Sequence, residues 1–442
     1  MVLGGGAPGA QTLGMTASRR PFLSALAALA AGLLPAQQDP VAAAKLVPAA
    51  ELCGRVETHG SLTLLRTWGT ADQRGYAHGR LLAVQVVEVL RGELQARFAR
   101  KRPVLQQARA TLGRNIAWPD EVRAEIAALF RGLVDAGVDL AMPELDRDID
   151  EKDLLLANAL DVYGLLGCSG FTLWGDQVEG GGVLTGRNFD WPFTGAHMVD
   201  RTMLLVQHLP DGNATASVTW PGYVAIVTGV NRDGITAFLH VGNAEIRFMP
   251  EPESWASAVA VRAVLEQSRA KGGTACFDLA RELLEQTSPP IGYITRVTLP
   301  AVPADGPPAA VFEADHDDVV AAPVVSGAVV TNHFLGREDG RPAPKDSIDR
   351  HKRIVGVIEQ CLGADDHAVS VAEAWDALVA VQRGGGHAFG TLHSLVFRAE
   401  PWHFELRVGL HTPKGLVAAP SADRVHVLTR DQLFPATVPA TL

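Results

Sequence analysis

Cys168 and the polar residues after it form the clearest chemistry-bearing pattern in the chain. Gly167 precedes the cysteine at a change from helical to strand-like texture, and Arg187, Asn188 and Asp190 follow across a hairpin. A nearby cation lowers a thiol pKa and a carboxylate can orient an amine, so these residue types suit a cysteine nucleophile. A regular strand would put Arg187 and Asp190 on opposite faces, and Asn188 and Asp190 on the same face.

These residues and several distant motifs resemble the choloylglycine-hydrolase group of N-terminal-nucleophile (Ntn) hydrolases, which includes bile-salt hydrolases, penicillin V acylases and acid ceramidase. The likeness is strongest to the acyl-CoA:6-aminopenicillanate acyltransferase family, and it extends from about residue 60 to the end of the chain. The motifs that carry it are Gly167-Cys168, Gly186-Arg187-Asn188-x-Asp190, Thr331-Asn332-His333-Phe334, Trp68-Gly69-Thr70, Gly75-Tyr76-Ala77-His78-Gly79 and Gly390-Thr391-Leu392-His393-Ser394.

The resemblance implies that the chain cuts its own Gly167–Cys168 bond. Cys168 then becomes a new N-terminus, with its thiol as nucleophile and its α-amine as base. A free α-amine has a reference pKa of about 8, which suits that task near neutral pH. The resemblance also implies that Asp190 holds the amine and that Arg187 lies beside the thiol.

Asn332 is implied as a donor to the oxyanion of the tetrahedral intermediate. Arg350, in Ser347-Ile348-Asp349-Arg350, resembles the late site arginine of the group. The second asparagine of the group's site has no clear match here. Either His240 or Asn243 could take its place, and the sequence leaves both open.

The surrounding sequence predicts an α+β fold. Apolar spacing predicts helices over 81–100 and 119–137 ahead of Cys168. After it, the sequence predicts paired strands interrupted by helix pairs, which is typical of antiparallel sheets covered by helices. The resemblance implies a four-layer αββα sandwich. The predicted strands are 171–174, 183–191, 203–209, 215–220, 223–230, 235–241, 310–314, 325–331, 391–399 and 402–409; the helices are 255–267, 274–286, 347–362 and 369–381.

Three segments organise the chain. Residues 1–36 resemble an export signal of the twin-arginine type, because Arg19 and Arg20 precede an Ala/Leu-rich run too short to span a bilayer. Met15 could then be the true start. Residues 37–167 are expected to be a helical pro-segment, and residues 168–442 the Ntn catalytic subunit. An exported, periplasmic or extracellular protein is therefore expected.

The composition limits the partners. A net charge of −10 without a basic run disfavours nucleic acid. The expected partners are a small N-acyl amide or acyl-thioester substrate and the chain's own cleaved pro-segment, with no membrane span in the mature chain. The chemistry needs no metal or organic cofactor. The four cysteines lack zinc or redox spacing, and their disulfide pairing is left open.

The predicted activity is acyl transfer or hydrolysis at non-peptide C–N bonds through a Cys168 thioester. The acyl chain, the amine and the balance between hydrolysis and transfer are not given by the sequence. Two alternatives stay open. One is a papain-like cysteine peptidase that pairs Cys168 with His333 or His393, and the other is an exported binding protein that kept the fold and lost catalysis.

Overall fold

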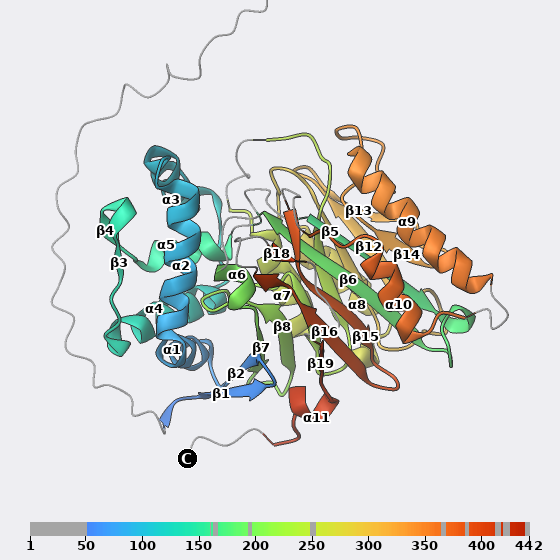
Figure 1. The fold of residues 1–442 in the computed structure, drawn as a ribbon, viewed down its shortest axis with the longest axis horizontal. Coiled ribbons are helices and arrows are strands. Elements are labelled where there is room, and N and C mark those ends of the chain that lie inside the picture. Colours follow the sequence, from blue (N-terminus) through green and yellow to red (C-terminus); the bar gives the residue numbers. More distant parts are fainter. Residues whose placement is uncertain are drawn as a thin grey trace, which may run out of the picture. The chain divides into compact units, whose positions relative to one another are not determined.

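The computed structural model describes residues 51–437 except 160, 162–166, 193–196, 248–252, 364–367, 385–388, 412–416 and 419–424. The predicted export signal lies outside the described residues. Two large sheets dominate the described part (Figure 1). The sequence prediction of an α+β fold is therefore confirmed.

The larger sheet has nine strands, and all of its neighbouring pairs are antiparallel except the parallel pair β2–β7. Its strands in spatial order are β1 (Gly54–His59), β2 (Leu62–Trp68), β7 (Met203–His208), β8 (Ala214–Thr219), β9 (Thr228–Asn231), β10 (Thr236–Val241), β11 (Tyr293–Thr298), β12 (Ala309–Ala314) and β13 (Val319–Ala322).

The second sheet has six strands, and every pair is antiparallel. Cys168 lies on its second strand. Its strands in spatial order are β14 (Ala328–Val330), β5 (Gly167–Trp174), β6 (Val183–Pro192), β15 (Phe389–Arg398), β16 (His403–Val408) and β19 (Val425–Val427).

The two sheets face each other, and helices cover their outer faces. Thr172 of β5 lies 3.2 Å (Oγ1–Oγ1) from Thr298 of β11, and Arg296 of β11 donates to the carbonyl of Gly186 at 2.7 Å. Helices α7 (Ser257–Gln267) and α8 (Ala275–Leu284) pack on the nine-stranded sheet, while α9 (Lys345–Leu362) and α10 (Val371–Val379) pack on the six-stranded sheet. This arrangement is the predicted αββα sandwich.

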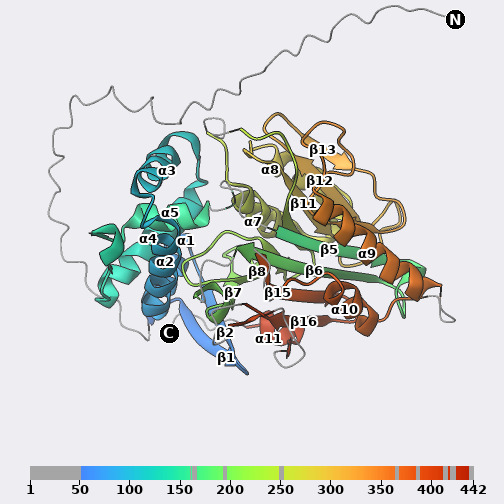
Figure 2. The ribbon, with the colours of Figure 1, turned by 45° about the horizontal axis from the view of Figure 1, so that its top comes forward.

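In the described residues before Cys168, five α-helices form a group beside the nine-stranded sheet (Figure 2). They are α1 (Ala71–Leu81), α2 (Ala83–Phe98), α3 (Arg102–Asn115), α4 (Asp120–Ala136) and α5 (Glu151–Asn158). The segment 37–167 is not helical throughout, however, because β1 and β2 extend the large sheet through the β2–β7 pair. The segment expected to be cleaved off is therefore part of the main fold.

The motif around Gly75 and Gly79 explains how α1 packs. A Cβ at Gly75 would lie 2.0 Å from the Glu125 carbonyl oxygen, and one at Gly79 would lie 2.1 Å from that of Leu129. Only glycine lets α1 approach α4 this closely. The motif that resembled a family pro-segment therefore fixes a helix crossing.

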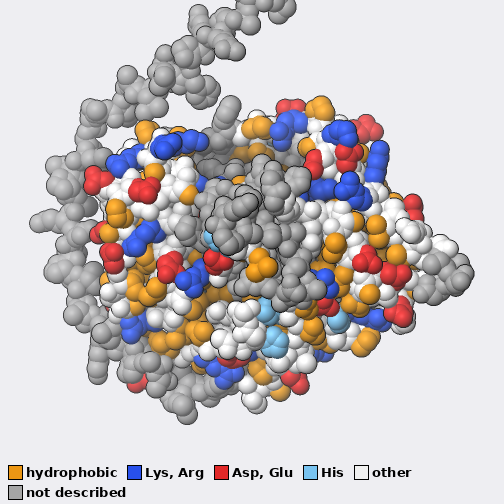
Figure 3. Space-filling view, viewed as in Figure 1, with side chains coloured by type: hydrophobic (Ala, Val, Ile, Leu, Met, Phe, Trp, Pro, Cys, Tyr) orange, Lys and Arg blue, Asp and Glu red, His pale blue; other side chains and the backbone are white. Residues whose placement is uncertain are grey.

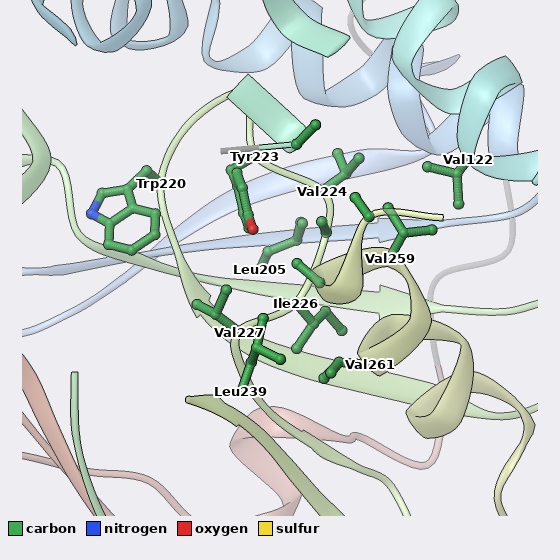
Figure 4. Close-up of a cluster of buried hydrophobic side chains, with 14 of the residues drawn as sticks. Val122, Leu205, Trp220, Tyr223, Val224, Ile226, Val227, Leu239, Val259 and Val261 are labelled. Atoms are coloured by element: carbon green, nitrogen blue, oxygen red, sulfur yellow. The ribbon is translucent and has the colours of Figure 1, made fainter. Parts of the chain in front are cut away.

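The core beneath these helices joins the pro-segment to the catalytic part. Figure 4 shows Val122 of α4 near Val259 of α7, with Tyr223, Val224 and Leu239 on the sheet side. All five side chains belong to one buried hydrophobic cluster. Burial of this kind stabilises by about 25 cal/mol per Å² of apolar surface, so the cluster is a strong link between the two parts.

One predicted strand is wrong in extent. The sequence predicted a strand over 223–230, but β9 contains only Thr228–Asn231. The main-chain N–H groups of Val224 and Ala225 donate instead to Asn158 Oδ1 of α5, at 2.7 and 3.0 Å. A side chain from the pro-segment thus replaces the strand partner that this segment would need.

Some elements have no counterpart in the sequence prediction. They include β1, β2, β11, β13 and β19, the short helices α6 (His197–Asp200) and α11 (Arg430–Leu433), and the two-residue strands β3 (Ala141–Met142), β4 (Arg147–Asp148), β17 (Leu410–His411) and β18 (Val417–Ala418). Helices α1, α3 and α5 were expected only as unspecified parts of the helical pro-segment.

The surface of the described residues is mixed in character. On the face seen in Figure 3, acidic, basic and hydrophobic side chains are interspersed. Among the described residues, no helix is both long enough and apolar enough to cross a membrane.

Candidate active site

The Cys168 thiol lies between the two sheets and is fully buried. Arg187 Nη2 donates to its Sγ at 3.2 Å and to the Leu239 carbonyl oxygen at 2.8 Å. The thiol itself lies 3.4 Å from that same carbonyl, to which it donates. Burial raises the pKa of Cys168 to about 11, although the Arg187 charge opposes this. The thiol is therefore protonated in the uncleaved chain.

Two other predicted residues bind the main chain of Cys168. Asn332 Oδ1 accepts from the Cys168 N–H at 3.1 Å, and Arg350 Nη1 donates to the Cys168 carbonyl at 2.7 Å. Arg350 Nη2 also donates to Asn332 Oδ1 at 2.7 Å. The Asn332 main-chain N–H donates to Ser347 Oγ at 2.7 Å, which fixes the turn. These contacts bring Asn332 and Arg350 together at the predicted nucleophile.

Asp190 lies on the other face of β6 from Arg187, as a regular strand requires. Its Oδ1 accepts from Thr391 Oγ1 at 2.7 Å, and its Oδ2 lies 3.4 Å from Arg383 Nε. In the β5–β6 register Asp190 is opposite Gly167. The carboxylate thus lies beside the backbone where a new amine would form, while Arg187 lies beside the thiol. Among the described contacts, Asp190 makes no hydrogen bond to Cys168 N.

The two residues that could supply a second oxyanion donor lie in different settings. Asn243 Oδ1 accepts from the Phe334 N–H at 2.7 Å, and its Nδ2 donates to the Arg341 carbonyl. His240 is fully buried, and neither ring nitrogen has a hydrogen-bond partner among the described residues. Asn243 therefore holds a loop, whereas the His240 ring has its polar atoms unused.

Arg296 was not predicted from the sequence, although it lies close to the site. Its guanidinium carbon is 5.3 Å from the centre of the Phe238 ring, and that of Arg187 is 5.6 Å from the same ring. Both arginines are fully buried. Arg296 is the charged residue of the otherwise uncharged segment Tyr293–Thr298, and this charge was the sequence feature that could have identified it.

An apolar pocket is lined in part by Phe189, the cross-strand partner of Cys168, although Cys168 itself is not among its lining residues. Helix α2 of the pro-segment forms one wall. The lining residues are Val89, Leu90, Glu93, Leu94, Arg97, Ala157, Asp161, Phe189, Trp191, Met198, Trp220, Pro221, Tyr223 and Val227. Figure 4 shows Trp220, Tyr223 and Val227 of this group. Glu93 and Arg97 form an ion pair at 3.0 Å, so the lining is largely apolar apart from this pair and the Asp161 carboxyl group.

Asp161, near the end of the pro-segment, is a buried carboxyl group in this pocket. Its Oδ2 accepts from the Ala258 N–H at 3.2 Å, in the first turn of α7, and Tyr293 donates its hydroxyl to the Asp161 main-chain carbonyl. Burial raises the pKa of Asp161 to about 6. The folded protein is therefore more stable when this carboxyl group is protonated, because burial disfavours its charge more than the Ala258 N–H favours it.

Asp161→Asn is expected to change the pH dependence of stability. A folded-state pKa raised from 3.8 to about 6 gives stability that is present below pH 4 and lost as the pH rises through 6. The wild type should therefore lose up to about 3 kcal/mol relative to the variant between pH 4 and pH 8. Urea unfolding of both proteins at the two pH values measures this. A difference that stays constant with pH would contradict it.

One acidic cluster could hold a cation by geometry. The ligand atoms of Asp315, His316 and Asp317 lie within 4.8 Å of one another. Arg337 already binds Asp315 at 2.6 Å and also pairs with Asp318 and Asp339. The arginine thus supplies the positive charge that the carboxylates need, and the cluster lies apart from Cys168 as a loop structure.

The structure offers no support for a papain-like pair. Among the described contacts, His333 Nδ1 approaches Thr331 and Ser347, and His393 Nε2 lies 3.1 Å from Thr228 Oγ1. Neither imidazole ring makes a described hydrogen bond to the Cys168 sulfur. None of the four cysteines, all of them described, forms a disulfide.

Comparisons with known proteins give only distant likeness. No protein-family model and no curated protein matches the chain. Among solved structures it is similar to a Caenorhabditis elegans ortholog of N-acylethanolamine-hydrolyzing acid amidase, with 13% identity over 59% of this chain and 100% of that chain, at a TM-score of 0.39.

Two further solved structures show a similarly distant likeness. A mutant conjugated bile acid hydrolase from Clostridium perfringens has 9% identity over 59% of this chain and 96% of its own, at a TM-score of 0.37. Penicillin V acylase from Agrobacterium tumefaciens has 14% identity over 56% and 84%, at a TM-score of 0.34. At identities and TM-scores this low, nothing about the activity or substrate of this chain follows from them.

Proposed function

We propose that this chain is a cysteine Ntn hydrolase that cuts its own Gly167–Cys168 bond and then cleaves or transfers acyl groups at linear amide bonds of small N-acylated molecules. The observation that carries the proposal is the set of contacts at Cys168. Arg187 lies 3.2 Å from the thiol, while Asn332 and Arg350 hold the main-chain N–H and carbonyl of the same residue. An inert buried cysteine needs none of these partners.

Self-cleavage would begin with attack of Cys168 Sγ on the carbonyl carbon of Gly167. The S–C bond forms, the C–N bond to Cys168 breaks, and the thiol proton passes to the departing nitrogen. The result is a thioester with a free α-amine. Water then hydrolyses the thioester, leaving the Gly167 carboxylate and the Cys168 thiol. Asp190, which is opposite Gly167 in the sheet, would then hold the new ammonium group.

The mature reaction would repeat this chemistry on a substrate. The α-amine takes the thiol proton as Sγ attacks the substrate carbonyl, and the electron pair of the C=O bond moves to oxygen. Asn332 donates to that oxyanion, since its Nδ2 has a second hydrogen besides the one given to the Val241 carbonyl at 3.0 Å. Collapse expels the amine, which takes the proton. Water or another nucleophile then removes the acyl group from sulfur.

The pocket beside Phe189 suggests where an acyl group would bind. Its walls are mainly aromatic and aliphatic, Glu93 and Arg97 neutralise each other, and the Asp161 carboxyl group disfavours an acidic acyl chain. An uncharged acyl group fits such a lining better than a charged one. We propose that the pro-segment stays bound after cleavage, because α2 forms part of this wall, and that the protein is exported.

A panel of small N-acyl amides, some of them fluorogenic, tests the function. The panel consists of N-acyl-7-amino-4-methylcoumarins with straight acyl chains of increasing length and with phenoxyacetyl, together with penicillin V and acyl-homoserine lactones. We expect hydrolysis of uncharged acyl amides, with much lower rates for succinyl and glutaryl analogues. Hydroxylamine added to the assay should yield hydroxamate if transfer competes with hydrolysis. Failure of cleaved protein to turn over any of these amides would contradict the proposal.

A further inference from the structure

His240 lies near the end of β10, between two main-chain carbonyl groups that contact site residues. The carbonyl of Leu239 receives the Cys168 thiol and the Arg187 guanidinium, and the carbonyl of Val241 receives the Asn332 carboxamide. The His240 side chain therefore leaves the strand between the contacts of the nucleophile and those of the predicted oxyanion donor.

Strand alternation sets the direction of this side chain. Residues two apart on a strand share a face, so His240 lies on the face of Phe238. The Phe238 ring contacts the guanidinium groups of Arg187 and Arg296. Arg187 and Cys168 lie on the neighbouring strands β6 and β5 of the six-stranded sheet, and Arg187 donates to the Cys168 thiol. His240 thus faces the space between the sheets, where Cys168 lies.

The imidazole ring of His240 is buried, and its nitrogen atoms make no described hydrogen bond. His240 is fully buried, and both of its nitrogens lack a hydrogen-bond partner among the described residues. Leaving a buried polar group unsatisfied costs about 1–3 kcal/mol, so such a group calls for a function. Burial, and then the charges of Arg187, Arg296 and Arg350, lower the pKa of His240 well below its usual range.

A neutral imidazole has one N–H to donate. It is poorly suited to take a proton from the thiol, because the three guanidinium charges oppose the imidazolium form. It is well suited to donate to a developing negative charge. The other nearby candidate, Asn243, has its carboxamide committed to Phe334 and Arg341.

We propose that His240 is a catalytic residue whose neutral imidazole N–H donates to the substrate oxyanion beside the Asn332 carboxamide. This proposal rests on the proposed amide chemistry at Cys168. The same N–H would serve the tetrahedral intermediate at Gly167 during self-cleavage.

His240→Phe and His240→Asn test the role, with His208→Asn as a matched control. His208 is another buried histidine on a strand of the same sheet, and it contacts Arg66 and Arg232 away from Cys168. The rate constant kcat is measured per Cys168 thiol, counted by mass after iodoacetamide labelling of the cleaved protein. The substrate is the best fluorogenic amide of the panel.

His240→Phe should lower kcat about 10²- to 10³-fold, with KM changed by less than about threefold. Because His240→Asn keeps a hydrogen-bond donor, its kcat should be at least about tenfold higher than that of His240→Phe. The kcat of His208→Asn should stay within about threefold of the wild-type value. If His240→Phe folds with a wild-type melting temperature but does not cleave itself, the rate of self-cleavage replaces kcat, and His240→Asn must restore it.

Three outcomes would overturn the role of His240. The first is a kcat of His240→Phe within about threefold of wild type. The second is an equal loss in His240→Asn and His240→Phe when both melt as wild type does. The third is a wild-type protein that turns over no amide, which would overturn the proposed function as well. The first two leave that function intact.

Discussion

Cys168→Ala is expected to yield a single uncleaved chain without amidase activity, whereas the wild type separates into two chains at Gly167–Cys168. Both reactions need the same sulfur, and alanine offers no nucleophile. Removal of a catalytic nucleophile typically costs about 10⁶-fold in kcat, so activity should fall to the assay background. Intact mass of the denatured proteins shows the cleavage, and the fluorogenic panel shows the activity.

Cys276→Ala is the matched control for this experiment. Cys276 is also a buried cysteine, and its thiol donates to the Arg269 carbonyl at 3.1 Å, far from the contacts of Cys168. This variant should cleave and hydrolyse as the wild type does. Cleavage of the Cys168→Ala chain at the same bond would refute self-cleavage by the thiol. An uncleaved wild type that hydrolyses amides would refute activation by cleavage.

Local patterns predicted the elements whose partners lie near them in sequence. The apolar spacing of α2 and α4 gave both helices to within a few residues, and the turn after β7 gave the β7–β8 hairpin. Opposite faces for Arg187 and Asp190 also followed from strand geometry alone. The family resemblance, and not strand geometry, assigned Arg187 to the thiol and Asp190 to the new amine; in the structure Arg187 lies 3.2 Å from the thiol, and Asp190 is opposite Gly167.

Long-range pairing was beyond the sequence. The parallel partner of β2 is β7, which lies on the other side of the expected cleavage point, and no periodicity in β2 identifies it. The segment after Trp220 has strand-like composition, but Asn158 takes its N–H groups. Periodicity reports which face of an element is buried and not which element covers it.

The choice between His240 and Asn243 shows the same limit at the site. The sequence offered both residues as candidates for the second oxyanion donor, and because they are only three positions apart, local spacing did not separate them. Only the contacts separate them, because Phe334 and Arg341 take up the Asn243 carboxamide while the buried His240 ring has no described hydrogen-bond partner. Contacts between residues so far apart in the sequence cannot be predicted from the local spacing of residue types.

Glu125 is a buried charged group that joins the pro-segment to the catalytic part. It lies on α4, fully buried, with Arg74 of α1 at 3.2 Å and Arg262 of α7 at 2.6 Å. Burial alone would raise the pKa of Glu125, but Arg262 and then Arg74 lower it. Gln207 of β7 donates to the second carboxylate oxygen. One side chain thus binds groups on both sides of the expected cleavage point.

Glu125→Ala is expected to destabilise the protein by about 3–5 kcal/mol, because it leaves two buried guanidinium groups without their carboxylate. Glu121→Ala, on the exposed first turn of the same helix, should change stability by less than about 0.5 kcal/mol. Urea midpoints measure both. Because self-cleavage removes the covalent link, the cleaved Glu125→Ala protein should also release its small chain on size-exclusion chromatography at urea concentrations where the wild type and Glu121→Ala keep theirs. Equal midpoints and equal retention in the two variants would show that the apolar core around Val122 and Val259 alone holds the chains together.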